Sequence, residues 1–252
     1  MSITVKSIVA AAITHPVIGR TIGAVYGQRI PNRGIVVDTS SPLITPRMKG
    51  YLFWGLYESA ELRFLHKYLR TDLDVIELGA SIGVVSCQIR KRIAPERKLV
   101  AVEADWRLIE VLRRNLELNE LARNVQILNA AVCADGGAGT AYFSVGQNNI
   151  SGKLSANRNG NTSEVPALTL DGIAERSDIR EYALVSDIEG AETSFIFGAD
   201  AALAGCRQII IELHDCEFAG EYVTVHQLRE AIVRKHGFAL RDSYGPVCVF
   251  ER

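Results

Sequence analysis

From about residue 73 onward, two patterns of apolar positions alternate along the chain. Short continuous apolar runs, typical of strands buried on both faces, are separated by segments with helical spacing of apolar residues. This alternation indicates βαβ units and a parallel sheet, hence an α/β fold. The predicted strands span residues 73–78, 99–102, 125–128, 140–145, 182–185 and 208–213. The predicted helices span residues 57–69, 82–93, 107–119, 191–197 and 225–235.

Two segments depart from this alternation. Residues 238–241 and 247–250 flank a Ser-Tyr-Gly-Pro turn and predict a terminal antiparallel hairpin. Residues 146–163 are rich in Asn, Ser and Gly and predict a long loop, a candidate lid. Its Lys153 and Arg158 are candidate contacts to an anionic acceptor, although solvated charge is the commoner role.

The first fifty residues carry four of the prolines and frequent glycine, so we expect an irregular extension with little regular structure. Residues 51–252 then form the main domain. The apolar run 8–13 is too short to span a bilayer and predicts a helix packed on that domain. The alternative is a helix that docks to a partner or a membrane surface, and a homodimer through residues 1–50 is an expectation of the same kind.

Composition excludes several classes of protein. The chain has 252 residues, 48% hydrophobic, with 28 Lys and Arg against 29 Asp and Glu, so a net charge of -1 offers no global attraction to nucleic acid. Five scattered cysteines form no C-x-x-C pair, which argues against a disulfide scaffold or a zinc site. A reducing compartment, the cytoplasm, fits best.

A glycine turn follows the first predicted strand and opens a helix. Gly79 and Gly83 permit a tight turn and the close approach of a ligand, but Ala80 and Ser81 replace the second glycine of the dinucleotide fingerprint. Glu77, two positions before Gly79, suits a cationic ligand better than a phosphate.

A second acid, Glu103, ends the next strand, where it can accept hydrogen bonds from both ribose hydroxyls of a nucleoside. Together with Glu77 it suits a nucleoside that carries an ammonium group, such as S-adenosylmethionine. The alternative is that Glu77 caps a helix and Glu103 lies on the surface.

Further acids and a histidine end the later strands, where ligands bind in open α/β sheets. Asp187 and Glu189 follow one strand, and Glu212 and His214 end the next. His214 has the better intrinsic pKa for a base that takes a hydroxyl proton, while Asp187 and Glu189 are suited to orient hydroxyls. The alternatives are a structural histidine and a divalent metal held by Asp187, Glu212 and His214; we expect no metal.

Several of these segments resemble the FkbM family of S-adenosylmethionine-dependent methyltransferases. Residues 77–83 look like its D-x-G-A-N-x-G motif, 102–104 like V-E-P, 170–171 like T-L-D, 187–192 like D-x-E-G-A-E, and 211–214 like the strand-ending E-x-H. Tyr57 and Glu58 precede a helix, as in that family. The resemblance runs from about residue 51 to the C-terminus.

The resemblance implies a Rossmann-like, class I methyltransferase fold: a seven-stranded, mostly parallel sheet with helices on both faces and an antiparallel last strand. It also implies methylation of a hydroxyl, often on a sugar or polyketide. Glu77 and Ser81 replace the family's Asp and Asn, and Val185 stands where the family often has a Lys.

The sequence therefore predicts a methyltransferase that acts on a hydroxyl of a carbohydrate or glycosylated small molecule, with S-adenosylmethionine as cofactor. The expected cofactor-binding residues are Glu58, Glu77, Gly79, Ala80, Ser81, Gly83, Glu103, Ala104, Asn129 and Asp187. The expected catalytic residues are Asp187, Glu189 and His214. The alternatives are a partner-binding protein without activity and a nicotinamide-dependent oxidoreductase.

Overall fold

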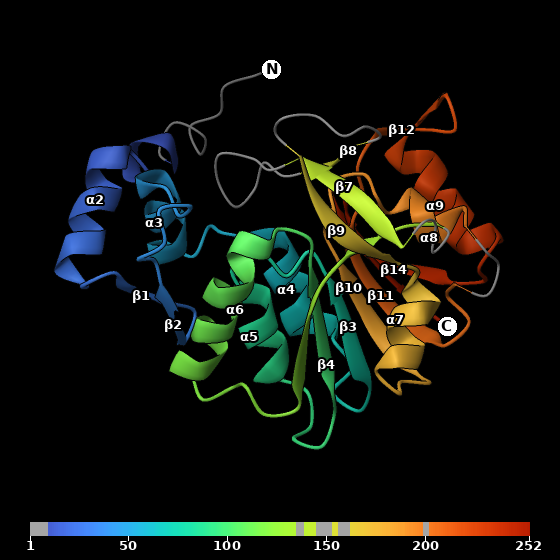
Figure 1. Cartoon of the computed structure of the whole chain (residues 1–252), viewed down its shortest axis with the longest axis horizontal. Coiled ribbons are helices and arrows are strands. Elements are labelled where there is room, and N and C mark those ends of the chain that lie inside the picture. The colour runs from blue at the N-terminus through green and yellow to red at the C-terminus, as the bar shows by residue number, and fades with distance from the viewer. Residues whose placement is uncertain (1–9, 135–138, 145–152, 156–161, 199–201) are drawn as a thin grey trace.

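A central seven-stranded sheet organises the protein (Figure 1). A computed structural model describes residues 10–134, 139–144, 153–155, 162–198 and 202–252. In spatial order the strands are β14 (Ala239–Tyr244), β15 (Val247–Glu251), β11 (Cys206–Glu212), β10 (Tyr182–Ser186), β3 (Asp74–Leu78), β4 (Leu99–Glu103) and β5 (Val125–Asn129). Strands β5, β4, β3, β10 and β11 run parallel, and β15 is antiparallel to both of its neighbours. The predicted sheet and terminal hairpin are confirmed.

Helices cover both faces of this sheet. One face packs against α4 (Ser59–Tyr68), α5 (Val84–Arg90) and α6 (Trp106–Leu118), and the other against α7 (Leu170–Arg176), α8 (Thr193–Ile196) and α9 (Val225–Arg234). Successive strand residues point to opposite faces, so Val75 lies in one core and Ile76 in the other. This two-sided burial explains the continuous apolar runs in the sequence.

For the described residues 10–50, the expectation of an irregular extension is wrong. This region contains α2 (Pro16–Val25), a hairpin of β1 (Arg29–Asn32) and β2 (Ile35–Asp38), and α3 (Pro46–Phe53). Pro16 and Pro46 each stand in a first helical turn, where proline is favoured, with His15 and Thr45 as N-caps. The expected domain boundary at residue 50 falls inside α3.

The hairpin of this N-terminal region packs on α6, and its buried Ile30 and Val37 join the core that α4, α5 and α6 share. Asn115 of α6 and Asn119, the C-cap of that helix, hold strand β2 by hydrogen bonds. Asn115 Oδ1 accepts from the Asp38 amide at 2.7 Å, and Asn119 Oδ1 accepts from the Val36 amide at 2.8 Å. Val17 and Val25 on α2 are 59% and 73% exposed, and a homodimer through this region stays a prediction.

A second, four-stranded sheet lies beside the main one and was only partly predicted. It consists of β6 (Ala131–Val132), β9 (Thr162–Leu168), β7 (Thr140–Ser144) and β8 (Lys153–Ser155). Strand β8 and the start of β9 correct the expected loop over residues 146–163. The rest of that candidate lid lies outside the described residues.

Three smaller corrections concern the C-terminal half. The helix expected over residues 191–197 is confined to α8, α7 was not expected, and β12 (Cys216–Phe218) pairs with β13 (Glu221–Val223) in an unexpected hairpin. Among the described residues, no helix has the length and apolar character needed to cross a bilayer.

Candidate functional site

A cavity of about 320 Å³ opens at the carboxyl ends of β3, β4, β10 and β11. The strand order reverses between β3 and β10, which is where open α/β sheets bind ligands. Its volume lies within the usual range of small-molecule sites. Among the described residues, its lining contains no Lys or Arg, and its titratable groups are mainly carboxyls. These carboxyls belong to Glu58, Glu61, Glu77, Glu103, Asp105, Asp187, Glu189 and Glu212.

The cavity has two halves, one at the ends of β3 and β4 and the other at the ends of β10 and β11. The glycine turn, residues 79–83, lies where they meet. Gly79 has φ +84°, and a Cβ there would lie 1.9 Å from the carbonyl oxygen of Asp187. The close backbone of the neighbouring strand end therefore requires this glycine, and the expected approach of a ligand here stays a prediction. Gly83 has φ +82°, and a Cβ there would lie 3.3 Å from Leu112 Cα of α6.

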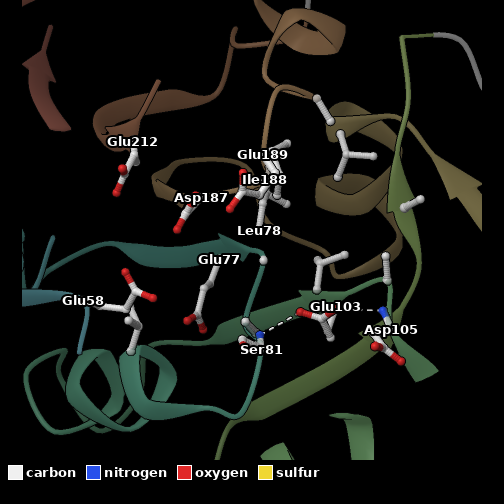
Figure 2. A pocket seen from close by; sticks show the side chains of 18 of the residues that line it. Glu58, Glu77, Leu78, Ser81, Glu103, Asp105, Asp187, Ile188, Glu189 and Glu212 are labelled. Carbon is white, nitrogen blue, oxygen red and sulfur yellow. Dashed lines mark hydrogen bonds between the residues drawn. The ribbon is translucent and has the colours of Figure 1, made fainter. Parts of the chain in front are cut away.

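Two backbone amides donate hydrogen bonds to the carboxyl group of Glu103, one from the glycine turn and one from the residues after β4 (Figure 2). Its Oε2 accepts from the Ser81 amide and its Oε1 from the Asp105 amide, each at 2.7 Å. Burial raises the pKa of Glu103 to about 7, although these hydrogen bonds oppose the shift. Asn129 supports the same segment, because its Nδ2 donates to the carbonyl oxygens of Glu103 and Ala104 at 2.9 and 3.1 Å.

Glu77 presents an unpaired carboxylate oxygen at the cavity wall. Ser86 Oγ donates to its Oε2 at 2.6 Å, while the buried Oε1 has no hydrogen-bond partner. Burial raises the pKa of Glu77 to about 8. An orphaned carboxylate oxygen in a cavity without basic side chains fits a ligand that brings N–H donors and positive charge, as S-adenosylmethionine does.

The other half of the cavity contains looser charges. Figure 2 shows Glu58, Asp187 and Glu212 apart from the bonded group of Glu103, Ser81 and Asp105. Burial and the charges of Glu58 and Glu212 raise the pKa of Asp187 to about 8. Burial, with Glu212 and Glu189, likewise raises the pKa of Glu58 to about 7.

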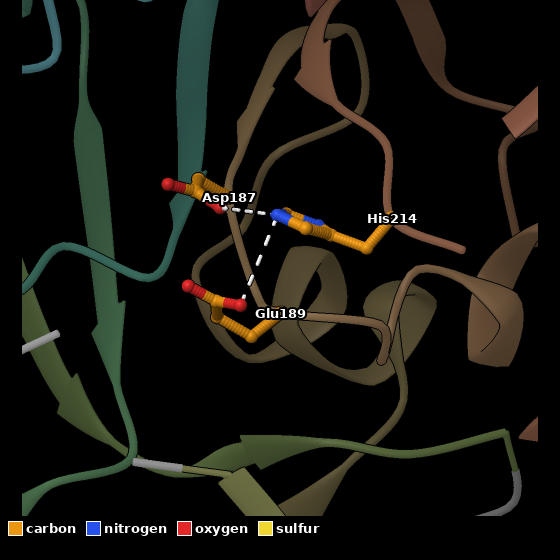
Figure 3. Close-up of side chains that lie close together, drawn as sticks. All are labelled: Asp187, Glu189 and His214. Carbon is orange, nitrogen blue, oxygen red and sulfur yellow. Dashed lines mark ion pairs between the residues drawn. The ribbon is translucent and has the colours of Figure 1, made fainter. Parts of the chain in front are cut away.

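In this half, the Nε2 atom of His214 faces two carboxylates (Figure 3). Its Nε2 lies 3.7 Å from Asp187 Oδ1 and 3.9 Å from Glu189 Oε2, and its Nδ1 lies 2.9 Å from Glu192 Oε1. Burial alone lowers the pKa of His214, but Glu192, Asp187 and Glu189 raise it to about 9. The turn that carries Glu189 and Gly190 is left-handed, with φ +53° and +99°.

Two sets of side chains have ligand atoms close enough for a metal ion, namely Asp187 with Glu189 and His214, and Glu58 with Asp187 and Glu212. Within each set the atoms lie within 4.8 Å of one another. The set expected as the alternative, Asp187 with Glu212 and His214, is not one of these groupings. Acidic clusters are common without an ion, so we assign no metal site to either set.

Most of the predicted site residues meet at this cavity. Glu58, Glu77, Gly79, Ala80, Ser81, Glu103, Ala104, Asp187, Glu189, Glu212 and His214 line it. Gly83 and Asn129 do not line it and support its walls instead.

Sequence reasoning missed three residues of the site. Glu61 is buried on α4 at the cavity, and Tyr57 Oη lies 3.4 Å from Ser81 Oγ. Glu192 is fully buried against His214. Glu192 is the last residue of the segment 187–192 that resembles the family motif, but the sequence indicated no role for it. The available signal for Glu61 was an acidic residue among the apolar positions of a predicted helix.

Solved structures resemble this fold at low identity. The precorrin-6y C5,15-methyltransferase from Geobacter metallireducens is 16% identical, with a TM-score of 0.42 over 76% of this chain and 86% of its own. The ribosomal protein L11 methylase from Lactobacillus delbrueckii subsp. bulgaricus is 11% identical, with a TM-score of 0.44 over 78% and 77%. Sp1610 from Streptococcus pneumoniae, in complex with S-adenosyl-L-methionine, is 12% identical, with a TM-score of 0.43 over 75% and 71%.

A search of curated proteins found no match. The model of the methyltransferase FkbM domain matches residues 77–240, which is more than half of the chain. The match begins at Glu77 and includes the glycine turn, Glu103, Asp187 and His214. The chain thus belongs to the FkbM methyltransferase family and is an S-adenosylmethionine-dependent methyltransferase.

Proposed function

We propose that the protein transfers a methyl group to a hydroxyl of a carbohydrate or a glycosylated small molecule. The observation that carries this proposal is the position of His214, whose Nε2 faces the acid-lined cavity beside Asp187 and Glu189. A histidine in this place can take the proton of an attacking hydroxyl, and neighbouring carboxylates can accept hydrogen bonds from other hydroxyls.

In this proposal, one half of the cavity binds the cofactor and the other binds the acceptor. S-adenosylmethionine supplies the electrophilic methyl group. Glu103 is suited to accept hydrogen bonds from ribose hydroxyls, and the unpaired Oε1 of Glu77 to meet the cationic part of the cofactor. Asp187 and Glu189 orient the acceptor, and His214 receives its proton.

The charge of the lining supports a neutral, hydroxyl-rich acceptor. Eight carboxyls and no described Lys or Arg line the cavity, so the lining offers a phosphodiester no Lys or Arg to pair with, and each carboxyl that ionises repels it. This disfavours nucleic acid as the acceptor. Sugar hydroxyls carry no charge and donate hydrogen bonds that carboxylates accept.

One strand position cannot supply the proton acceptor, namely the one where the family often has a lysine. Val185 occupies that position, is fully buried in β10 and does not line the cavity. His214 is then the side chain best suited to the task. Membership of the methyltransferase family sets aside the oxidoreductase and the inactive partner-binding alternatives.

An acceptor screen tests the proposal. The purified protein is incubated with S-adenosylmethionine and a panel of sugars, glycosides and glycosylated small molecules, and mass spectrometry detects products heavier by one methyl group. We expect an O-methylated sugar product with the wild type and a loss of rate on the order of 10²–10⁴-fold with His214→Gln. Transfer only to nitrogen acceptors or to RNA, included in the panel, would overturn the proposal.

A further inference from the structure

The side chain of Glu192 contacts the ring of His214. Its side chain is fully buried, Oε1 lies 2.9 Å from Nδ1 of His214, and Oε2 has no hydrogen-bond partner. On the opposite side of the ring, Nε2 lies 3.7 and 3.9 Å from Asp187 and Glu189, beyond hydrogen-bond range. One ring nitrogen is therefore held and the other is free to meet a ligand.

We propose that Glu192 is the positioning residue for the proton acceptor, holding a proton on Nδ1 of His214 so that the Nε2 lone pair faces the cavity. This inference rests on the proposed methyl transfer to a hydroxyl. It assigns Glu192 a role through His214, without contact to the substrate.

The argument for this tautomer is one of donors and acceptors. An ionised carboxylate only accepts hydrogen bonds, so Nδ1 must carry the proton in the contact with Glu192. In a neutral imidazole the proton on one nitrogen leaves a lone pair on the other. During the reaction the hydroxyl proton moves to Nε2, and the resulting imidazolium is stabilised by the buried carboxylate behind it.

The groups around His214 explain why the ring needs such control. Glu192 precedes α8, Asp187 and Glu189 follow β10, and Glu212 ends β11, so carboxyls from three segments of the chain lie near the ring. These charges favour the imidazolium in the ligand-free protein. A cationic ligand in the cavity opposes that charge and favours the neutral ring with its free Nε2.

The fold contains an internal reference for the test. His236 Nε2 lies 2.8 Å from the carbonyl oxygen of Ile196, which only accepts, so His236 carries its proton on Nε2. Ile196 ends the short helix α8 that Glu192 precedes. His236 therefore reports any displacement of α8 when Glu192 is changed.

The experiment is NMR of the full chain labelled with ¹⁵N-histidine, recorded from neutral pH to above the His214 pKa and assigned with His214→Gln. We expect opposite tautomers in one spectrum, with the proton on Nδ1 in His214 and on Nε2 in His236. In Glu192→Gln, which removes the charge at nearly constant shape, we expect a lower pKa for His214. In Glu192→Met, which removes the acceptor, we expect the Nε2–H tautomer to become populated.

A change in His214 with His236 unaltered supports the proposal, since a merely structural role would move both signals. The proposal is overturned by a wild-type His214 that carries its proton on Nε2, or by a tautomer unchanged in Glu192→Met. Selective broadening of the His214 signals by micromolar Mn²⁺ would also overturn it, by making the ring a metal ligand.

Kinetics separate this inference from the proposed function. With an acceptor from the screen, Glu192→Met should lower kcat by about 10- to 100-fold with little change in KM, comparable to the loss of other carboxylate partners of histidine. If His214 has the expected tautomer but no hydroxyl is methylated, the proposed function fails and the positioning stands. If a hydroxyl is methylated and the tautomer does not depend on Glu192, the positioning fails alone.

Discussion

The two halves of the cavity hold their carboxyl groups in different ways. On the side of β3 and β4, Glu103 is fixed by two amide hydrogen bonds of 2.7 Å, and Glu77 by a bond of 2.6 Å from Ser86. On the side of β10 and β11, Asp187 approaches His214 only to 3.7 Å. The proposed cofactor side is thus held by short hydrogen bonds to its carboxyls, whereas on the proposed acceptor side Asp187 and Glu189 approach His214 without a hydrogen bond.

The difference follows from local structure. The β3–α5 turn brings the backbone amide of Ser81 to Glu103, and Ser81 adopts φ +47° between two glycines of positive φ. The second amide, that of Asp105, follows β4. The β10–α8 turn offers side chains instead of amides, since its left-handed residues are Glu189 and Gly190.

The largest effect is expected where the two halves meet. Gly79→Ala places a methyl group on the Asp187 carbonyl oxygen and should lower the free energy of unfolding by about 3 kcal/mol or more, from overpacking added to a left-handed backbone. Denaturant unfolding measures the loss. Gly220→Ala is the matched control, because Gly220 has φ +82° and nothing within 4 Å of the added Cβ. Equal losses in both variants would show that the close approach costs nothing.

Removing the fixed acid tests the cofactor side alone. Glu103→Ala deletes an acceptor of charge-assisted hydrogen bonds and should weaken binding of S-adenosylhomocysteine by about 100-fold, measured by isothermal titration. Glu110→Ala, at an exposed position on α6, is the control and should bind normally. Unchanged affinity in Glu103→Ala would remove the assignment of this residue to the ribose.

The pH dependence should separate charge from shape. The raised pKa values of Glu58 and Glu103, about 7, and of Glu77 and Asp187, about 8, mean that the folded protein binds protons that the unfolded chain has released. Stability should therefore fall as pH rises from about 4.5 to 8, which thermal unfolding without ligand would detect.

Over the same range the ionised carboxyls should increasingly favour a cationic ligand. We expect S-adenosylmethionine to bind about tenfold more tightly at pH 8.5 than at pH 6, and the neutral sulfur of S-adenosylhomocysteine to bring a smaller gain. Parallel titrations of the two ligands measure this difference. Identical pH profiles would mean that the ionisation of the cavity carboxyls does not affect binding of the sulfonium.

The smallest effect is expected for Asn129, which holds the backbone next to the cavity without lining it. Asn129→Ala deletes the donor to the Glu103 and Ala104 carbonyl oxygens without touching the cavity lining. We expect the binding free energy of S-adenosylhomocysteine to weaken by about 1 kcal/mol, which is about fivefold in affinity. An effect as large as that of Glu103→Ala would place Asn129 in direct contact with the ligand.

The sequence predicted the main sheet and most of the cavity, because both depend on short-range signals. Strands buried on two faces read as apolar runs, and the acids stand directly at strand ends. It failed where one residue type has two meanings. Pro16 and Pro46 contribute to the expectation of an irregular extension, although each stands in a first helical turn. For Gly79 the sequence indicates a tight turn but not the close approach of the Asp187 backbone, which also requires a glycine.

Contacts across the fold were beyond the sequence for a different reason. Glu192 is the N-cap of α8 and His214 follows β11, and only the tertiary fold brings them to 2.9 Å. Glu61 reaches the cavity from α4, where its position predicts a helical face and not the side chain's neighbours. The short strands β12 and β13 carry too few residues for a periodic pattern.

Asn115 gives the N-terminal hairpin a part in communication with the cavity. Its buried amide accepts from Asp38 of β2 and donates at 2.7 Å to the carbonyl oxygen of Ile82, inside the glycine turn. One rigid side chain thus spans both regions, and coupling between two sites is reciprocal. Cofactor binding should slow hydrogen exchange at the Asp38 amide, and a molecule that grips the hairpin should alter how tightly the distant turn holds its ligand.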